Sequence, residues 1–120
     1  MKTLLAFLLC LPLLATAAPD PWDDTDVALG ITAATAFAID WKQTQVIAQN
    51  PTKWHELNPI LGEHPTLRAV NQHFILNGLV IGGVAEYLPS TYRKWYLGST
   101  AVVEAAFATH NYKIGLRFAF

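Results

Sequence analysis

Cysteine is almost absent from this chain of 120 residues, and charged residues are scarce. The single cysteine is Cys10, and Asp, Glu, Lys and Arg make up 14% of the residues, against about a quarter in an average soluble domain. Once the N-terminal segment is removed, the remaining chain has no cysteine, which excludes disulfides, thiol chemistry and a cysteine-ligated zinc site. The charge deficit, beside an apolar fraction of 52%, points toward lipid as a partner.

Basic patches and nucleotide-binding or nucleophile motifs are also lacking. The formal net charge is -1, and basic and aromatic residues do not interleave, so nucleic acid is not expected as a partner. The sequence contains no P-loop, no dinucleotide-binding fingerprint and no nucleophile elbow. The length allows one domain, and no cofactor is expected.

The N-terminal residues have the pattern of a secretory signal peptide. Lys2 precedes an apolar run at residues 4–14, and Ala15 and Ala17 have the A-x-A spacing of a cleavage site. The run is shorter than the roughly 20 residues that a membrane span needs. We therefore expect a signal peptide at residues 1–17, an acidic linker at 18–26 and one membrane domain at 27–120.

Three apolar segments bounded by turn signals follow the linker, at about residues 27–49, 65–88 and 90–111. Each has about 21 to 24 residues, enough to cross a bilayer. Apolar residues lie on nearly all faces, and small residues crowd runs such as GITAATAFA and GLVIGGVA. The prediction is an all-α, three-helix transmembrane bundle. Caps are expected at the starts of the first and third helices: Asp24, Thr25 or Asp26, and Ser90 or Thr91.

Two other architectures fit parts of the sequence. The C-terminal run YKIGLRFAF and residues 29–41 alternate in the manner of strands in a small outer-membrane β-barrel. This alternation fails in FILNGLVIGGVAEYL, so the barrel is only an alternative. A soluble periplasmic helical bundle is the other.

Charge placement predicts an orientation in the bacterial inner membrane. Five basic residues would face the cytoplasm and two the other side, in agreement with the positive-inside rule. The N-terminus would be periplasmic after signal cleavage, and the C-terminus cytoplasmic. The inner set is Lys42, Lys53, Arg68, Lys113 and Arg117, and the outer set is Arg93 and Lys94.

Ionisable residues inside the predicted helices form the main candidate site. Counted from the outer helix ends, Asp40 lies 13 residues deep, His73 15 and Glu104 14, which places them within roughly 3 Å of one level at about 1.5 Å per residue. With their neutral neighbours at helical spacing they form a polar layer, which we expect to hold the helices in register. The alternative is a buried proton-handling or metal site. The polar layer comprises Asp40, Thr44, His73, Asn77, Glu104 and Asn111.

The segment WHELNPILGEHP, residues 54–65, joins the first two predicted helices. It begins like the zincin motif H-E-x-x-H, but Pro59 stands where the second His must be, so two ligands cannot share one helix face. Asn58 before a proline favours a turn, and Gly62 permits a tight bend. A structured bend is therefore predicted. The alternative is a metal or catalytic loop, with His55, Glu56 and His64 as weak candidate ligands.

At DWKQT, ELNPILGEHP and NYKIG the chain resembles a group of small, uncharacterised exported or membrane proteins of bacteria and tailed phages. The pattern is D-W-x-Q-T, then E-x-N-P-I-L-G-x-H-P, then a Glu in the third helix. The resemblance covers about residues 25–115 and implies a helical membrane architecture, but it brings no activity. It marks as shared positions Asp40, Gln43, Thr44, Glu56, Asn58, Pro59, Gly62, Glu104 and Asn111.

These features favour a small, non-enzymatic integral membrane protein of the cell envelope that acts through helix contacts. Its expected partners are membrane lipid and either a second copy or another membrane protein. The alternative is a membrane-embedded hydrolase or metal-dependent enzyme that uses Asp40, His73 and Glu104, with Glu56 nearby. A phage-encoded role in exclusion or lysis is compatible with both hypotheses.

Overall fold

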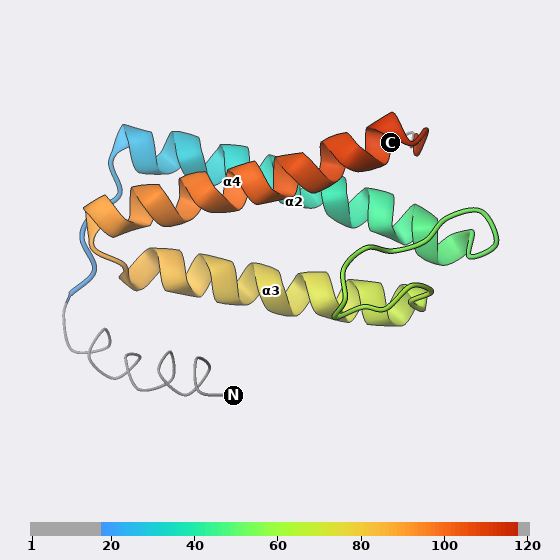
Figure 1. Ribbon diagram of the computed structural model, residues 1–120. Coiled ribbons are helices and arrows are strands. Elements are labelled where there is room, and N and C mark those ends of the chain that lie inside the picture. Colours follow the sequence, from blue (N-terminus) through green and yellow to red (C-terminus); the bar gives the residue numbers. More distant parts are fainter. Residues whose placement is uncertain (1–17, 118–120) are drawn as a thin grey trace.

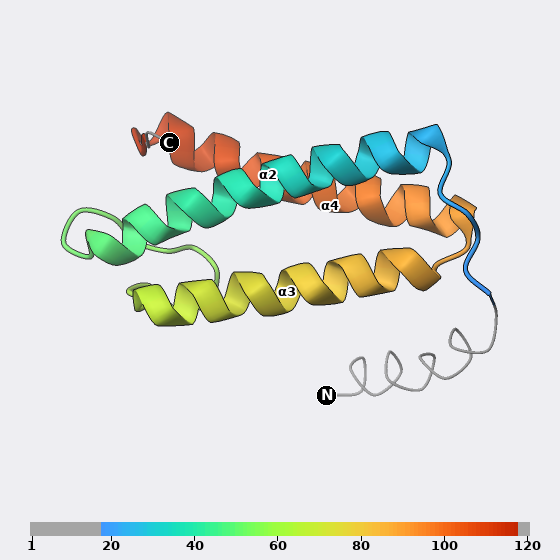
Figure 2. The ribbon, with the colours of Figure 1, turned by 180° about the vertical axis from the view of Figure 1, so that it is seen from behind.

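The computed structural model describes residues 18–117, and all regular structure in that range is helical. The helices are α2 (Asp24–Gln49), α3 (Leu67–Tyr87) and α4 (Ser90–Lys113). Helix α3 runs antiparallel to the other two, and α2 and α4 lie side by side in both views (Figures 1 and 2). The all-α prediction is therefore confirmed, and the alternating residues 29–41 lie within α2. The expected signal peptide, residues 1–17, lies outside the described residues.

The three helices begin in different ways. Asp23 caps α2, since its carboxylate accepts a hydrogen bond from the Asp26 backbone N–H at 2.8 Å, and the Asp26 carboxylate accepts one from the Asp23 N–H at 3.2 Å. The cap thus lies one residue before the predicted candidates. Thr66 caps α3 through the Ala69 N–H at 3.1 Å. Helix α4 follows Pro89 without a side-chain cap, so the prediction of Ser90 or Thr91 in that role was wrong.

Turn residues end the helices near the predicted positions. Helix α2 stops before Asn50, which is followed by Pro51, and α3 stops two residues before Pro89. Gly115 has a φ of 95°, which a residue with a side chain rarely adopts, and it ends α4.

The core lies mainly between α2 and α4, which pack along their length, while α3 packs on them less closely. Small side chains allow the close approach, since Ala33 and Ala36 on α2 and Ala101 on α4 are buried, and Leu97 on α4 is buried beside them. An aromatic cluster joins α3 to α2. Phe74 meets Phe37 edge-to-face with ring centroids 5.1 Å apart and stacks on Trp41 at 5.8 Å.

A buried ion pair joins the helices at the end where α2 and α4 begin. Arg93 and Asp26 have fully buried side chains, with Nη1 and Oδ2 3.0 Å apart. The guanidinium also donates to the carbonyls of Asp20 at 2.8 Å, Ala85 at 2.8 Å and Leu88 at 3.0 Å. The prediction of an acidic linker at residues 18–26 therefore fails in two respects. Helix α2 begins within this segment, at Asp24, and the backbone carbonyl of Asp20 accepts a hydrogen bond from the buried Arg93.

None of the helices within residues 18–117 combines the length and hydropathy of a membrane span. Apolar residues are spread around each helix, which led to the expectation of three transmembrane segments. Polar residues within the same helices lower their mean hydropathy below that of a membrane span. The described residues form a three-helix bundle, and the expected membrane-spanning segments are not supported.

Candidate functional site

The middle of the bundle contains a cavity of about 230 Å³ with polar side chains from every element around it. Asp40 comes from α2, His73 and Asn77 from α3, Glu104 from α4 and Asn58 from the loop between α2 and α3. The apolar part of the lining consists of Phe37, Ile60, Phe74, Ile81 and Phe107. The structure thus brings Asp40, His73 and Glu104 to one space, because three helices of similar length meet at a common depth.

A chain of hydrogen bonds connects α2 to α4 beside this cavity. The Asn111 amide donates to Asp40 Oδ1 and to Gln43 Oε1, each at 3.3 Å, and the Gln43 amide donates to the Ala108 carbonyl at 3.1 Å. Gln43 and Asn111 are buried, as is Thr44. Gln43 was missing from the predicted polar layer, although its spacing of three residues from Asp40 places both on one helix face.

Amide groups surround the imidazole of His73 on the α3 side. The Asn58 side-chain nitrogen lies 3.2 Å from His73 Nε2, and the Asn77 side-chain nitrogen lies 3.0 Å from the same atom. Asn77 shares a helix face with His73 four residues away, whereas Asn58 reaches the site only because the loop folds back over α3. The sequence offered no spacing signal for that contact.

Glu56 belongs to the cavity side of the loop. Its Oε1 accepts a hydrogen bond from the Asn58 backbone N–H at 2.9 Å, and its Oε2 is buried without a hydrogen-bond partner. Its charge acts on Asp40. The side chain therefore does not join His55 and His64 in the arrangement proposed for a metal loop. The bend itself forms as expected: Asn58 Oδ1 accepts from the Ile60 N–H at 3.0 Å, and Gly62 has a φ of 76°.

Among the described residues that line the cavity there is no Lys or Arg to neutralise the carboxyl groups of Asp40 and Glu104. Burial, the charges of Glu104 and Glu56, and a hydrogen bond with Glu104 together raise the pKa of Asp40 from 3.8 to about 8. Burial also raises the pKa of Glu104, and the hydrogen bond from Asp40 lowers it in part. Asp40 is therefore the protonated member of the pair at neutral pH, and it donates to Glu104.

This arrangement holds a proton between two helices. The buried Glu104 Oε2 has no hydrogen-bond partner, and neither does Glu56 Oε2. Buried polar atoms without partners are uncommon in native proteins and often mark functional positions. Chemically, the cavity brings together a neutral acid, a second carboxyl group and an imidazole.

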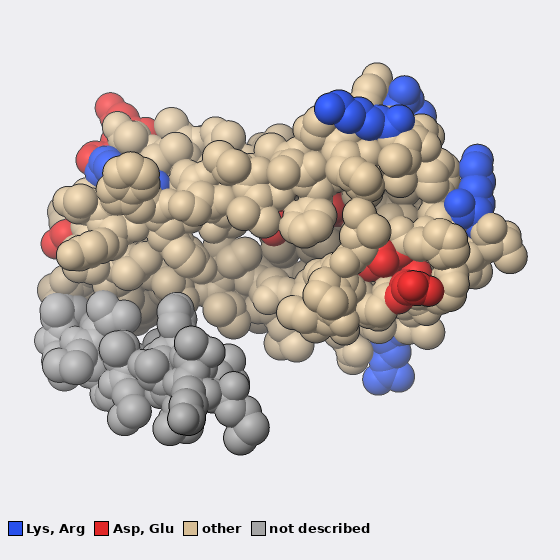
Figure 3. Space-filling model, viewed as in Figure 1, with Lys and Arg blue, Asp and Glu red and all other residues tan. Residues whose placement is uncertain are grey.

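A second feature of the molecule is an exposed apolar belt around its middle. Leu79 on α3 is 69% exposed and Val102 on α4 is 70% exposed. Figure 3 shows one face of the molecule, on which Lys and Arg lie toward the two ends and the central surface is mostly uncharged, apart from areas of Asp and Glu. The apolar belt comprises Ile31, Ile75, Leu76, Leu79, Val80, Val102, Val103 and Phe107.

No family model, no curated protein and no solved structure matches the chain. The functional conclusion therefore rests on the polar layer and the apolar belt.

Proposed function

We propose that this protein is a small, non-enzymatic protein of the bacterial cell envelope that acts by packing its apolar belt against the apolar helices of a membrane-protein partner. The supporting observation is the exposure of large apolar side chains on all three helices. Monomeric soluble proteins rarely leave extended apolar patches uncovered, because each exposed apolar side chain loses the free energy of burial.

The spacing within the belt suits contact with another helix. Ile75 and Leu79 are four residues apart on α3, as are Leu76 and Val80, so each pair lies one turn apart on one side of the helix. Such i, i+4 pairs are the usual anchors for helix-to-helix docking. Charged residues at the two ends of the bundle would then lie at the rim of the contact.

The polar layer has a supporting role in this proposal. Asn111 and Gln43 tie α4 to α2, and Asn58 and Asn77 hold His73 on α3. These directional bonds help to fix the relative positions of the helices at this level, where the neighbouring contacts of Phe37 and Phe74 are apolar. The layer thereby sets which side chains the three helices present outward. A bacterial inner-membrane location and a role in phage exclusion or lysis extend this proposal and rest on the resemblance.

Site-specific photocrosslinking in the producing cell tests the proposal. A photoreactive amino acid at Leu79 or Val102 should give a defined protein adduct larger than the chain itself. The same group at Tyr92, which is 65% exposed but lies in the first turn of α4 outside the belt, is the matched control and should give none.

Three outcomes would count against the proposal. An adduct of twice the chain mass, which contains only this sequence, would replace the partner by a second copy. Adducts with lipid alone, together with resistance to carbonate extraction, would replace it by the bilayer. Equal adducts at Tyr92 and at the belt positions would show that the belt is not a specific surface.

A second candidate function is hydrolysis at the cavity, and the protonated Asp40 beside Glu104 favours it. Two carboxyl groups with separated pKa values are a recurrent acid–base arrangement. In this role Asp40 donates a proton to a leaving group and Glu104 activates water. Asp40→Asn and Glu104→Gln should then abolish hydrolysis of ester, amide or phosphodiester probes without loss of the helical circular dichroism signal. Absence of activity in the wild-type chain would refute this candidate.

A further inference from the structure

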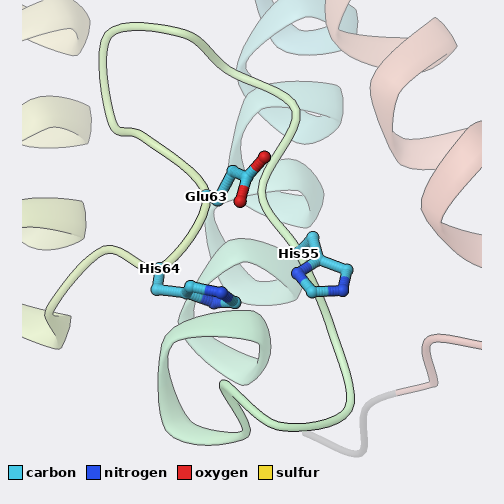
Figure 4. A group of neighbouring side chains, drawn as sticks. All are labelled: His55, Glu63 and His64. Atoms are coloured by element: carbon cyan, nitrogen blue, oxygen red, sulfur yellow. The ribbon is translucent and has the colours of Figure 1, made fainter.

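Two histidines and one glutamate meet on the outside of the loop between α2 and α3. One ligand atom each from His55, Glu63 and His64 lies within 4.8 Å of the other two. The two imidazole centroids are 5.0 Å apart with the rings tilted by 55°. Figure 4 shows the three side chains projecting into one space from the two facing arms of the loop. All three residues are exposed.

Backbone hydrogen bonds of the loop bring these side chains together. The Glu56 N–H donates to the Glu63 carbonyl at 2.9 Å, which pairs the arm after His55 with the arm before His64. Between the arms, the Asn58 carbonyl accepts hydrogen bonds from the N–H groups of Leu61 and Gly62, each at 3.1 Å. The positive φ of Gly62 then turns the chain back. The loop is therefore closed at its base by backbone hydrogen bonds, which position the three candidate ligands.

We propose that His55, Glu63 and His64 bind a zinc ion. Two imidazole nitrogens and one carboxylate oxygen are a ligand set found in zinc sites with three protein ligands, in which water takes the fourth position. Magnesium and calcium prefer oxygen ligands throughout, so the two imidazoles select a transition metal.

The geometry requires a small adjustment only. Ligand atoms around tetrahedral zinc lie about 3.3–3.4 Å apart, given metal–ligand distances of about 2.0–2.2 Å. The separations in the loop, up to 4.8 Å, therefore need to close by about 1.5 Å or less. Exposed side chains reach this by rotation about their side-chain bonds, while the paired backbone stays in place.

The bound ion would also act on the polar layer. The same loop carries Asn58, whose side chain contacts His73 at the cavity. A zinc ion that bridges the two arms would restrain the segment between them, which includes Asn58. Zinc binding is therefore expected to raise the thermal stability of the chain by mass action as well as to occupy the loop.

Titration of the full chain, purified without a histidine tag, with zinc chloride tests the site. Isothermal titration calorimetry should find one ion per chain with micromolar affinity. Replacement of zinc by cobalt should give the intense visible absorption of four-coordinate Co²⁺. His64→Gln should weaken zinc binding by at least about tenfold and remove both the cobalt band and the rise in melting temperature.

His110→Gln is the matched control, because His110 is an exposed histidine on α4 that does not belong to the group of three candidate ligands. This variant should bind zinc as the wild-type chain does. The proposal is overturned if wild-type binding is weaker than about millimolar. It is also overturned if His64→Gln, with unchanged circular dichroism, retains wild-type affinity, or if His110→Gln loses as much affinity as His64→Gln.

Discussion

Loss of the Asp40 proton should make this protein less stable as the pH rises. The carboxyl group faces Glu104 on α4, Glu56 in the loop and the cavity that also holds His73, and the described lining residues include no Lys or Arg to neutralise it. Its pKa is about 8 in the folded chain and 3.8 in an unfolded one. Between these values the folded state binds the additional proton, so the free energy of unfolding decreases with increasing pH.

The magnitude follows from the difference between the two pKa values. A difference of about four corresponds to about 5–6 kcal/mol when the group is fully shielded from solvent. Asp40 is half-buried, and solvent screening reduces the expected loss to about 2–3 kcal/mol. The contribution is complete below the ordinary pKa and is lost as the pH rises through about 8.

Urea unfolding followed by circular dichroism at several values between about pH 5 and about pH 9 measures this loss. The stability of Asp40→Asn should depend on pH less than that of the wild-type chain, because the amide keeps the shape of the side chain and cannot ionise, while Glu104 still titrates. Asp24→Asn removes an exposed carboxyl group from the first turn of α2 and should retain the wild-type dependence. A wild-type free energy that stays constant or rises toward about pH 9 would refute the assignment of the proton to Asp40.

Three further predictions concern the ends of the bundle, the loop and the N-terminus. Arg93→Met should lower the melting temperature by more than about 10 °C, since it leaves the buried Asp26 carboxylate with the partly exposed Lys94 as its remaining cationic partner. Lys94→Met, which leaves the buried pair with Arg93 in place, should lower it by a few degrees at most. Equal effects in a thermal scan would contradict the burial argument. Gly62→Ala should destabilise the chain by about 1 kcal/mol in urea unfolding, because a Cβ has open space there but strains a φ of 76°, and an unchanged midpoint would show that the bend tolerates another conformation. Mass spectrometry of the exported protein should find Ala18 at the N-terminus, and an intact Met1 would contradict signal cleavage.

Much of the secondary structure could be predicted because its signals are local. Pro51 and Pro89 mark the connections, and the apolar segments between them read as helices from composition alone. The shared depth of Asp40, His73 and Glu104 also followed from counting residues at the helical rise, since antiparallel helices of similar length align their centres. The capping residue of α2 was predicted less accurately. Asp23 and Asp26 form a reciprocal pair, and the neighbouring Asp24 offers the same type of side chain in the sequence.

Contacts across the bundle could not be predicted in this way. By itself, the sequence determined three helices, a bend at Gly62 and a set of polar residues at one level, because propensity, proline and glycine act on neighbouring residues. Only the tertiary structure decided that Arg93 is buried on Asp26, that Asn58 reaches His73, and that Glu63 and not Glu56 joins the two loop histidines. These pairings depend on how the loop folds back and how the helices rotate about their axes, and residues distant in sequence carry no local signal for either.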